Sequence, residues 1–261
     1  MTTALARTVG TPAPATSRTP SLVRLTGVEL RKLVDTRAGR WLLIAIGLVA
    51  AVIITLQLAY APDDQQTFAS FFGTSLFPVG VLLPVLGILS ITTEWSQRTA
   101  LTTFALVPRR ERVIIAKLVA VLLAALASVL VCLAVAAVAT LVAEATGGAG
   151  IWRLDGMLLV HALVLQVSTA LIGVAFGLLL LHTPLAIVAY LVLPIAWSIL
   201  GALVQPLYRA GEWLDTNRTM EPLFTPEMTG GQWQRLVVSL LLWLVVPLVA
   251  GLVRTMRQEV T

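Results

Sequence analysis

The side chains that could perform covalent chemistry are few and widely spaced. Ser75, His161 and His182 lie in long apolar runs, and a Ser/His pair inside a membrane would suit hydrolysis. However, the G-x-S-x-G turn that presents a nucleophilic serine is missing around Ser75. The two histidines lack the H-E-x-x-H spacing of a zinc site, and Cys132 is the only cysteine. We therefore expect neither catalytic residues nor a metal site in this chain.

A source of chemical energy is also missing from the sequence. Lys32 and Lys117 are the only lysines and neither follows a glycine, so the phosphate-binding loop G-x-x-x-x-G-K-[ST] cannot occur. The apolar runs carry no charged residue at their centres, whereas ion-coupled carriers usually need such groups as relays. A sodium-coupled carrier, in which carbonyl and hydroxyl oxygens bind the ion, stays open as an alternative. Any energy for transport is expected to come from another chain.

The chain has the composition of a membrane protein. Hydrophobic residues make up 58% of it and charged residues 12%, against about 45–50% and 25% in soluble domains. Residues 156–208 contain no Asp, Glu, Lys or Arg, which is enough for two membrane crossings. We predict an all-α membrane protein with six transmembrane helices, at Trp41–Tyr60, Ser70–Thr92, Ile114–Ala143, Gly156–Leu181, Thr183–Val204 and Trp233–Val253. Gly173 and Gly177 have the small-xxx-small spacing that permits close helix packing.

The N-terminal region has two parts. Residues 1–20 are rich in Thr, Pro and Ala and are expected to be a disordered leader. Residues 21–40 are expected to form an amphipathic interfacial helix, and 41–261 the transmembrane domain. On a helical wheel the apolar residues share one face and the charged residues lie on the opposite face. The apolar face is made of Leu22, Val23, Leu30, Leu33 and Val34, and the charged face of Arg24, Arg31, Lys32 and Asp35.

The positions of the basic residues predict the orientation. Of the 18 Lys and Arg, only Arg153, Arg209, Arg218 and Arg235 fall in segments on the side opposite the N-terminus. Because cytoplasmic segments are enriched in Lys and Arg, both termini are predicted to lie in the cytoplasm. The same rule accounts for the net charge of +5, so we expect no nucleic-acid partner.

The most informative polar segment is the predicted cytoplasmic loop 93–117. It contains an acid, Glu94, and a mildly apolar stretch from Thr99 to Val107 that could form a short helix ending before Pro108. A basic group made of Arg109, Arg110, Arg112 and Lys117 follows it. The basic group by itself could be explained by the general enrichment of Lys and Arg in cytoplasmic segments, with long side chains that reach the membrane surface. That explanation does not cover an acid and a structured apolar patch held together at the membrane surface. These two features favour a contact surface on which a cytosolic partner exerts force.

This loop resembles the signature loop of ABC-2 type permeases, the membrane subunits of ABC exporters. The matching residues, in order, are Glu94, Arg98, Thr99, Thr102, Thr103, Phe104, Pro108, Arg109, Arg110 and Lys117. Many members, particularly actinobacterial ones, read close to E-Y-R-x-[GR]-T…T-x-T-F…P-x-R…A-K-L. The order of parts is similar too: an interfacial helix, six spans, and this loop after the second span. Where many relatives have Gly-Thr, this chain has Arg98-Thr99.

The resemblance implies a six-helix ABC-2 (type V ABC exporter-like) fold in a bacterial cytoplasmic membrane. It also implies two copies of the chain, or one copy and a related permease, docked on ABC ATPase subunits that bind ATP and Mg²⁺. Contact with the ATPase would involve Glu94, Arg98, Thr99, Thr103, Phe104, Pro108, Arg110 and Lys117, together with Leu30, Arg31, Lys32 and Leu33 of the interfacial helix. Membrane lipids are the other expected partners, with Arg109 and Arg110 on anionic headgroups.

The polar residues of the spans suggest what would cross the membrane. A translocation path is predicted to use Gln57, Gln166, Thr169 and Ser198, with Ser168 nearby. A mostly apolar lining of this kind suits a hydrophobic or amphipathic substrate, although the same side chains could join helices by hydrogen bonds. The alternatives are a non-transporting resistance, immunity or sensor subunit that binds an ATPase, an ion-coupled carrier, and an intramembrane hydrolase that uses Ser75 with a histidine.

Overall fold

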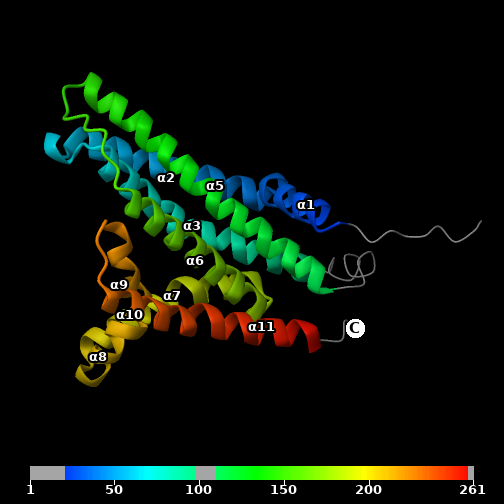
Figure 1. Cartoon of the computed structure of the whole chain (residues 1–261). Coiled ribbons are helices and arrows are strands. Elements are labelled where there is room, and N and C mark those ends of the chain that lie inside the picture. The colour runs from blue at the N-terminus through cyan, green and yellow to red at the C-terminus, as the bar shows by residue number, and fades with distance from the viewer. Residues whose placement is uncertain (1–20, 98–109, 258–261) are drawn as a thin grey trace, which may run out of the picture.

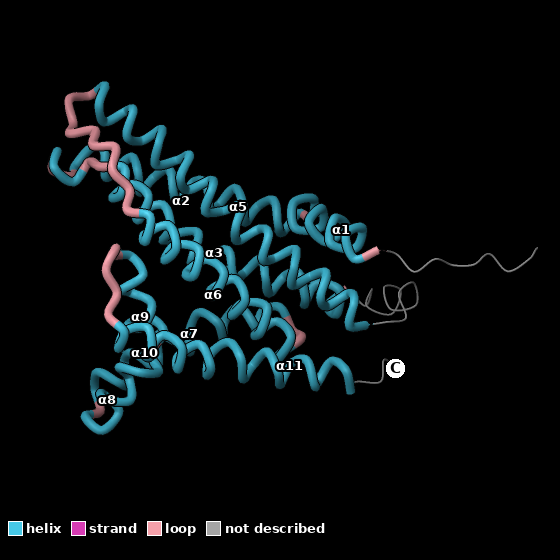
Figure 2. Tube along the Cα trace, viewed as in Figure 1, coloured by secondary structure: helices cyan, strands magenta, loops and turns pink. Residues whose placement is uncertain are grey.

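The computed structural model describes residues 21–97 and 110–257 (Figure 1). Within these ranges the chain is a set of α-helices joined by short connections, without a β-strand (Figure 2). Six helical segments of the described chain are long and apolar enough to cross a membrane. The prediction of an all-α protein with six membrane-spanning helices is confirmed at this level. The predicted leader, residues 1–20, lies outside the described residues, as do Arg98, Thr99, Thr103, Phe104 and Pro108 and the side chain of Arg110.

Each spanning segment overlaps its predicted range, and most extend beyond it. The segments are α2 (Arg37–Tyr60), α3 (Phe68–Ser96), α5 (Arg110–Ala145), α6 (Gly156–Leu180), α7 (Thr183–Leu203), and the run of α10 (Gly230–Leu240), η3 (Leu241–Val245) and α11 (Val246–Arg257). Several begin early because a polar residue outside the apolar run caps them. The hydroxyls of Thr36, Thr67 and Thr229 accept hydrogen bonds from the first-turn amides of α2, α3 and α10.

Helices α3 and α6 form the centre of the bundle. They are the most buried of the spanning helices and share an extensive contact. Gly173 of α6 lies directly against the backbone of Pro84 in α3, and Gly177 lies against Ile88. A Cβ added at Gly173 would overlap the Pro84 carbonyl oxygen, and one at Gly87 would lie 2.8 Å from the oxygen of Ala170. The close packing predicted for the glycine pair is confirmed, and its partner is α3.

The N-terminal helix α1 (Leu22–Asp35) packs mainly against α5 and also against α2. It buries Leu33 against these helices, together with the polar residues Thr26 and Glu29. Val23 and Val34 of the predicted apolar face are instead exposed, where a lipid interface would cover them. α1 ends at Asp35, and residues 37–40, which we had placed in the interfacial segment, begin α2.

A short helical segment lies at the end of the bundle opposite α1 (Figure 1). It consists of α8 (Gln205–Leu214), α9 (Thr216–Met220) and η2 (Glu221–Phe224), and η1 (Asp63–Gln65) is a separate turn between α2 and α3. Hydrogen bonds fasten this region to the spans, and two of them involve a histidine and a tryptophan of the spans. The ring Nδ1 of His161 is 2.8 Å from the carbonyl oxygen of Thr225, and the indole N–H of Trp243 donates to the carbonyl of Leu214 at 2.7 Å.

Candidate functional site

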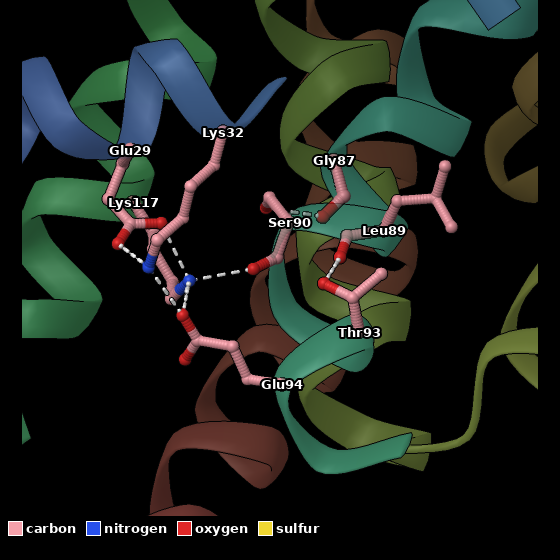
Figure 3. Close-up of polar contacts among 8 residues, drawn as sticks. All are labelled: Glu29, Lys32, Gly87, Leu89, Ser90, Thr93, Glu94 and Lys117. Atoms are coloured by element: carbon pink, nitrogen blue, oxygen red, sulfur yellow. Dashed lines mark hydrogen bonds and ion pairs between the residues drawn. The ribbon is translucent and has the colours of Figure 1, made fainter. Parts of the chain in front are cut away.

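Four charged side chains meet where α1, α3 and α5 come together (Figure 3). Glu29 and Lys32 come from α1, Glu94 from the last turn of α3, and Lys117 from the third turn of α5. We call these four residues the ionic cluster. They lie at the end of the bundle where α1, the last turn of α3 and the first turn of α5 are found (Figure 1). The cluster therefore stands beside both helices that flank residues 98–109.

The two lysines each bridge the two glutamates. The Nζ of Lys117 is 2.7 Å from Glu29 Oε2 and 3.0 Å from Glu94 Oε1. The Nζ of Lys32 is 2.7 Å from Glu29 Oε1 and 2.8 Å from the same oxygen of Glu94. Lys117 also donates to the carbonyl oxygen of Ser90 in α3, at 2.8 Å. The charges of the four side chains sum to zero, which suits a site with little access to water.

Local structure explains why these residues converge. Glu29 and Lys32 are three positions apart on α1, so they lie on the same side of that helix. α3 continues past Thr92 as a helix, which carries Glu94 to the level of α1. Burial differs within the cluster: the side chain of Lys117 is 5% exposed and that of Lys32 is 42% exposed. Lys117 thus depends on its protein partners, whereas Lys32 is partly hydrated.

The electrostatic surroundings keep Lys32 charged. Its partial burial lowers the pKa, but the hydrogen bonds and charges of Glu29 and Glu94 outweigh this and raise the pKa above its ordinary value of 10.5. For a lysine whose pKa is raised by folding, the stabilising contribution is present below its unfolded pKa. It is lost only as the pH rises through the folded pKa, so Lys32 holds its carboxylates throughout the neutral range.

A tight junction between α1 and α2 fixes the position of the cluster. Thr36 ends α1 and caps α2, and its hydroxyl accepts from the amide of Gly39 at 3.1 Å. A Cβ on Gly39 would overlap the carbonyl oxygen of Leu33, so the two helices approach too closely there for a side chain. A cavity of about 310 Å³ adjoins this junction and is lined by all four residues of the cluster.

The structure brings some of the predicted contact residues together. Glu94, Lys117 and Lys32 meet directly, and Leu33 is buried and lines the same cavity. Leu30 is half-buried and Arg31 is exposed, so neither belongs to the cluster. Sequence reasoning missed Glu29, the acid that joins both lysines. Its spacing of three residues from Lys32 was the available signal, but Lys117 lies 88 positions away along the chain.

The four residues predicted for a translocation path do not converge on one cavity. Gln57 donates to Ser70 between α2 and α3, and Gln166 donates to the carbonyl oxygen of Leu76, so both join helices. Thr169 lines a separate cavity between α3, α6 and α7. Ser198 reaches that cavity only indirectly, because its hydroxyl accepts from the side chain of Asn217, which lines it.

The structure does not assemble a hydrolytic site from Ser75 and the histidines. The Ser75 hydroxyl donates to the carbonyl oxygen of Phe72 at 2.8 Å and lies 3.5 Å from that of Cys132. His161 is fully buried and bonded to the backbone of Thr225, and His182 caps the first turn of α7. Neither ring bonds to the serine in the described part of the chain, so each side chain has a structural role.

Comparison with known proteins adds no identification. No protein-family model matches this chain, and no curated protein matches it in sequence.

Proposed function

We propose that this chain is the permease subunit of an ATP-driven exporter of the ABC-2 type. It moves a hydrophobic or amphipathic substrate outward, with ATP hydrolysed by a separate nucleotide-binding subunit. The ionic cluster is the observation that carries the proposal. It ties α1 to α3 and α5, the two helices that flank the segment whose sequence resembles the ABC-2 signature loop.

The packing supports a mechanical role for this cluster. A force on α1 or on residues 98–109 passes to α3 and α5 together, because Lys117 is bonded to both glutamates and to the α3 backbone. α3 in turn contacts α6 with almost no intervening side chains at Gly173 and Gly177. Close-packed helices shift as rigid bodies between discrete arrangements. Closure of the ATPase subunits would thereby move the spans between inward-open and outward-open states.

The proposal includes the remaining partners and the location. A second copy of the chain, or a related permease, completes the transporter, and the ATPase subunits bind ATP and Mg²⁺. The protein resides in a bacterial cytoplasmic membrane with both termini in the cytoplasm. In support, the described ends of the chain lie at the same end of the bundle, as an even number of spans requires (Figure 1). The peripheral helices α2 and α7 carry exposed apolar residues, and these would contact the lipid.

Co-purification tests the proposal. The tagged chain, isolated from its native host in a mild detergent, is expected to bring down a stoichiometric protein with a phosphate-binding loop, identified by mass spectrometry. Glu94→Gln keeps the side-chain shape but removes the charge that holds Lys32 and Lys117. We expect it to reduce recovery of the partner about tenfold, corresponding to about 1.4 kcal/mol.

Glu227→Gln is the matched control, since Glu227 is an exposed acid in the connection between η2 and α10 and is not part of the cluster. This variant should recover the partner at the wild-type level. The absence of any ATP-binding protein, even after crosslinking in the membrane, would contradict the proposal. A partner that co-purifies without any ATP-dependent flux would point instead to a resistance or sensor subunit.

A further inference from the structure

A second cavity, of about 400 Å³, lies between α3, α6, α7 and η3, and residues of α9 and η2 also line it. It shares no lining residue with the cavity beside the ionic cluster, and α9, which helps to line it, lies at the end of the bundle opposite α1 (Figure 1). Its walls are mainly aliphatic and aromatic, with Thr169 and Asn217 among the few polar residues. The volume is in the range of sites for small organic molecules. Phe77 of α3, which lines the cavity, has a side chain that is 60% exposed.

Among the residues that the structure describes, Glu221 is the only charged one that lines this cavity. It is exposed, and within the described residues it forms no ion pair. Arg218 and Arg235 line a neighbouring cavity that Glu221 also borders, but each is paired with another acid: Arg218 lies 3.6 Å from Asp215 and Arg235 lies 3.2 Å from Glu212. The cavity therefore presents a single carboxylate and no cation of its own, which favours a positively charged ligand over a neutral or anionic one.

Aromatic rings are the second feature of the cavity that suits an organic cation, besides the carboxylate of Glu221. Four aromatic residues line the cavity: Phe77, Tyr190, Phe224 and Trp243. Trp243 belongs to η3, a π-helical turn, and such turns occur frequently at functional sites. Its ring is held by the hydrogen bond to Leu214 and by stacking on Phe176, with centroids 6.3 Å apart. A ring fixed in this way can receive an organic cation on its face.

We propose that this cavity binds a lipophilic monocation, with its apolar body among the aromatic rings and its charge directed toward Glu221. The inference names the class of cargo for the proposed exporter. It rests on the proposed function only in treating the ligand as cargo, because binding itself requires neither ATP nor a partner.

Equilibrium binding of radiolabelled tetraphenylphosphonium to the full chain in nanodiscs of zwitterionic lipid tests the proposal. We expect saturable binding that is displaced poorly by triphenylphosphine oxide, a neutral molecule of similar shape. Glu221→Gln should weaken tetraphenylphosphonium binding about tenfold and leave triphenylphosphine oxide binding unchanged. Glu227→Gln, an exposed acid of the same region that does not line the cavity, should bind as the wild type does.

Two further variants place the ligand in this cavity. Thr169→Trp fills it and should abolish saturable binding, and Phe77→Leu, at an exposed position, should weaken binding about threefold. Helical circular dichroism and gel filtration confirm that each variant is folded. Absence of saturable binding to the wild type, or equal affinities for wild type and Glu221→Gln, would overturn the proposal. So would a neutral analogue that binds as tightly as the cation.

The two proposals can fail separately. If tetraphenylphosphonium binds as expected but no ATP-binding protein co-purifies, the exporter assignment is wrong and the cation site stands. If the ATPase co-purifies but the wild-type chain does not bind the cation, the cargo class is wrong and the exporter assignment stands.

Discussion

Replacing Lys117 with methionine is expected to lower the free energy of unfolding by about 3–5 kcal/mol, the loss typical of a buried ion pair that loses one partner. The reason is that Glu29 and Glu94 would keep their charges in a site with little water, and the Ser90 carbonyl would lose its donor. The measurement is an unfolding titration of the purified chain with sodium dodecyl sulfate in mixed micelles.

Lys32→Met is the matched control within the same cluster. Lys32 contacts the same two glutamates, but its side chain is 42% exposed, so water already screens its charge. We expect it to lower stability by no more than about 1 kcal/mol, as for exposed ion pairs. Adding Glu94→Gln to Lys117→Met should recover part of the lost stability, since it removes the unbalanced charge. Equal, small losses for the two lysine variants would show that the buried cluster is not what holds α1 on the bundle.

Gly173→Ala is the second substitution expected to have a large effect. Its new methyl group would overlap the carbonyl oxygen of Pro84, so α3 and α6 would have to separate. Overpacking of a close-packed interior destabilises by about 1–3 kcal/mol and occasionally more. We expect the upper part of that range here, because backbone rather than a flexible side chain stands in the way. The same unfolding titration measures it.

Gly47→Ala provides the comparison for this effect. Gly47 is also inside a spanning helix, but it is exposed and an added Cβ would meet nothing within 4 Å. Alanine is the better helix former by about 1 kcal/mol, so this variant should be as stable as the wild type or slightly more stable. If Gly173→Ala were tolerated equally well, the direct backbone contact between α3 and α6 would not be a determinant of the fold.

The spanning helices could be predicted from sequence because the bilayer imposes a simple requirement. About 20 apolar residues must follow one another, and hydropathy alone locates them. The ends of the helices were harder to predict, because capping residues such as Thr67 and Thr229 lie outside the apolar runs. The pairing of Gly173 with α3 likewise depends on which helices become neighbours, and no local pattern contains that information.

The candidate site was predicted only in part, for the same reason. Glu94, Lys32 and Lys117 were singled out one at a time, as an acid and basic residues near the membrane surface. The network that joins them exists only once α1 packs against α3 and α5, and this packing also brings in Glu29. The sequence-based predictions gave Glu221 no functional role. Its position at an aromatic cavity follows from how α9 and η2 fold back on the spans.

ATP hydrolysis by the purified complex tests most directly the claim that this chain couples a nucleotide-binding partner to the membrane. The complex isolated through the tagged chain, in nanodiscs, should hydrolyse ATP in a vanadate-sensitive reaction. A complex carrying Glu29→Gln and Glu94→Gln, assembled by crosslinking, should lose most of that activity, while one carrying Glu227→Gln should retain it. Hydrolysis no greater than that of a preparation from cells without the tag, or hydrolysis unaffected by the loss of both cluster carboxylates, would contradict the account.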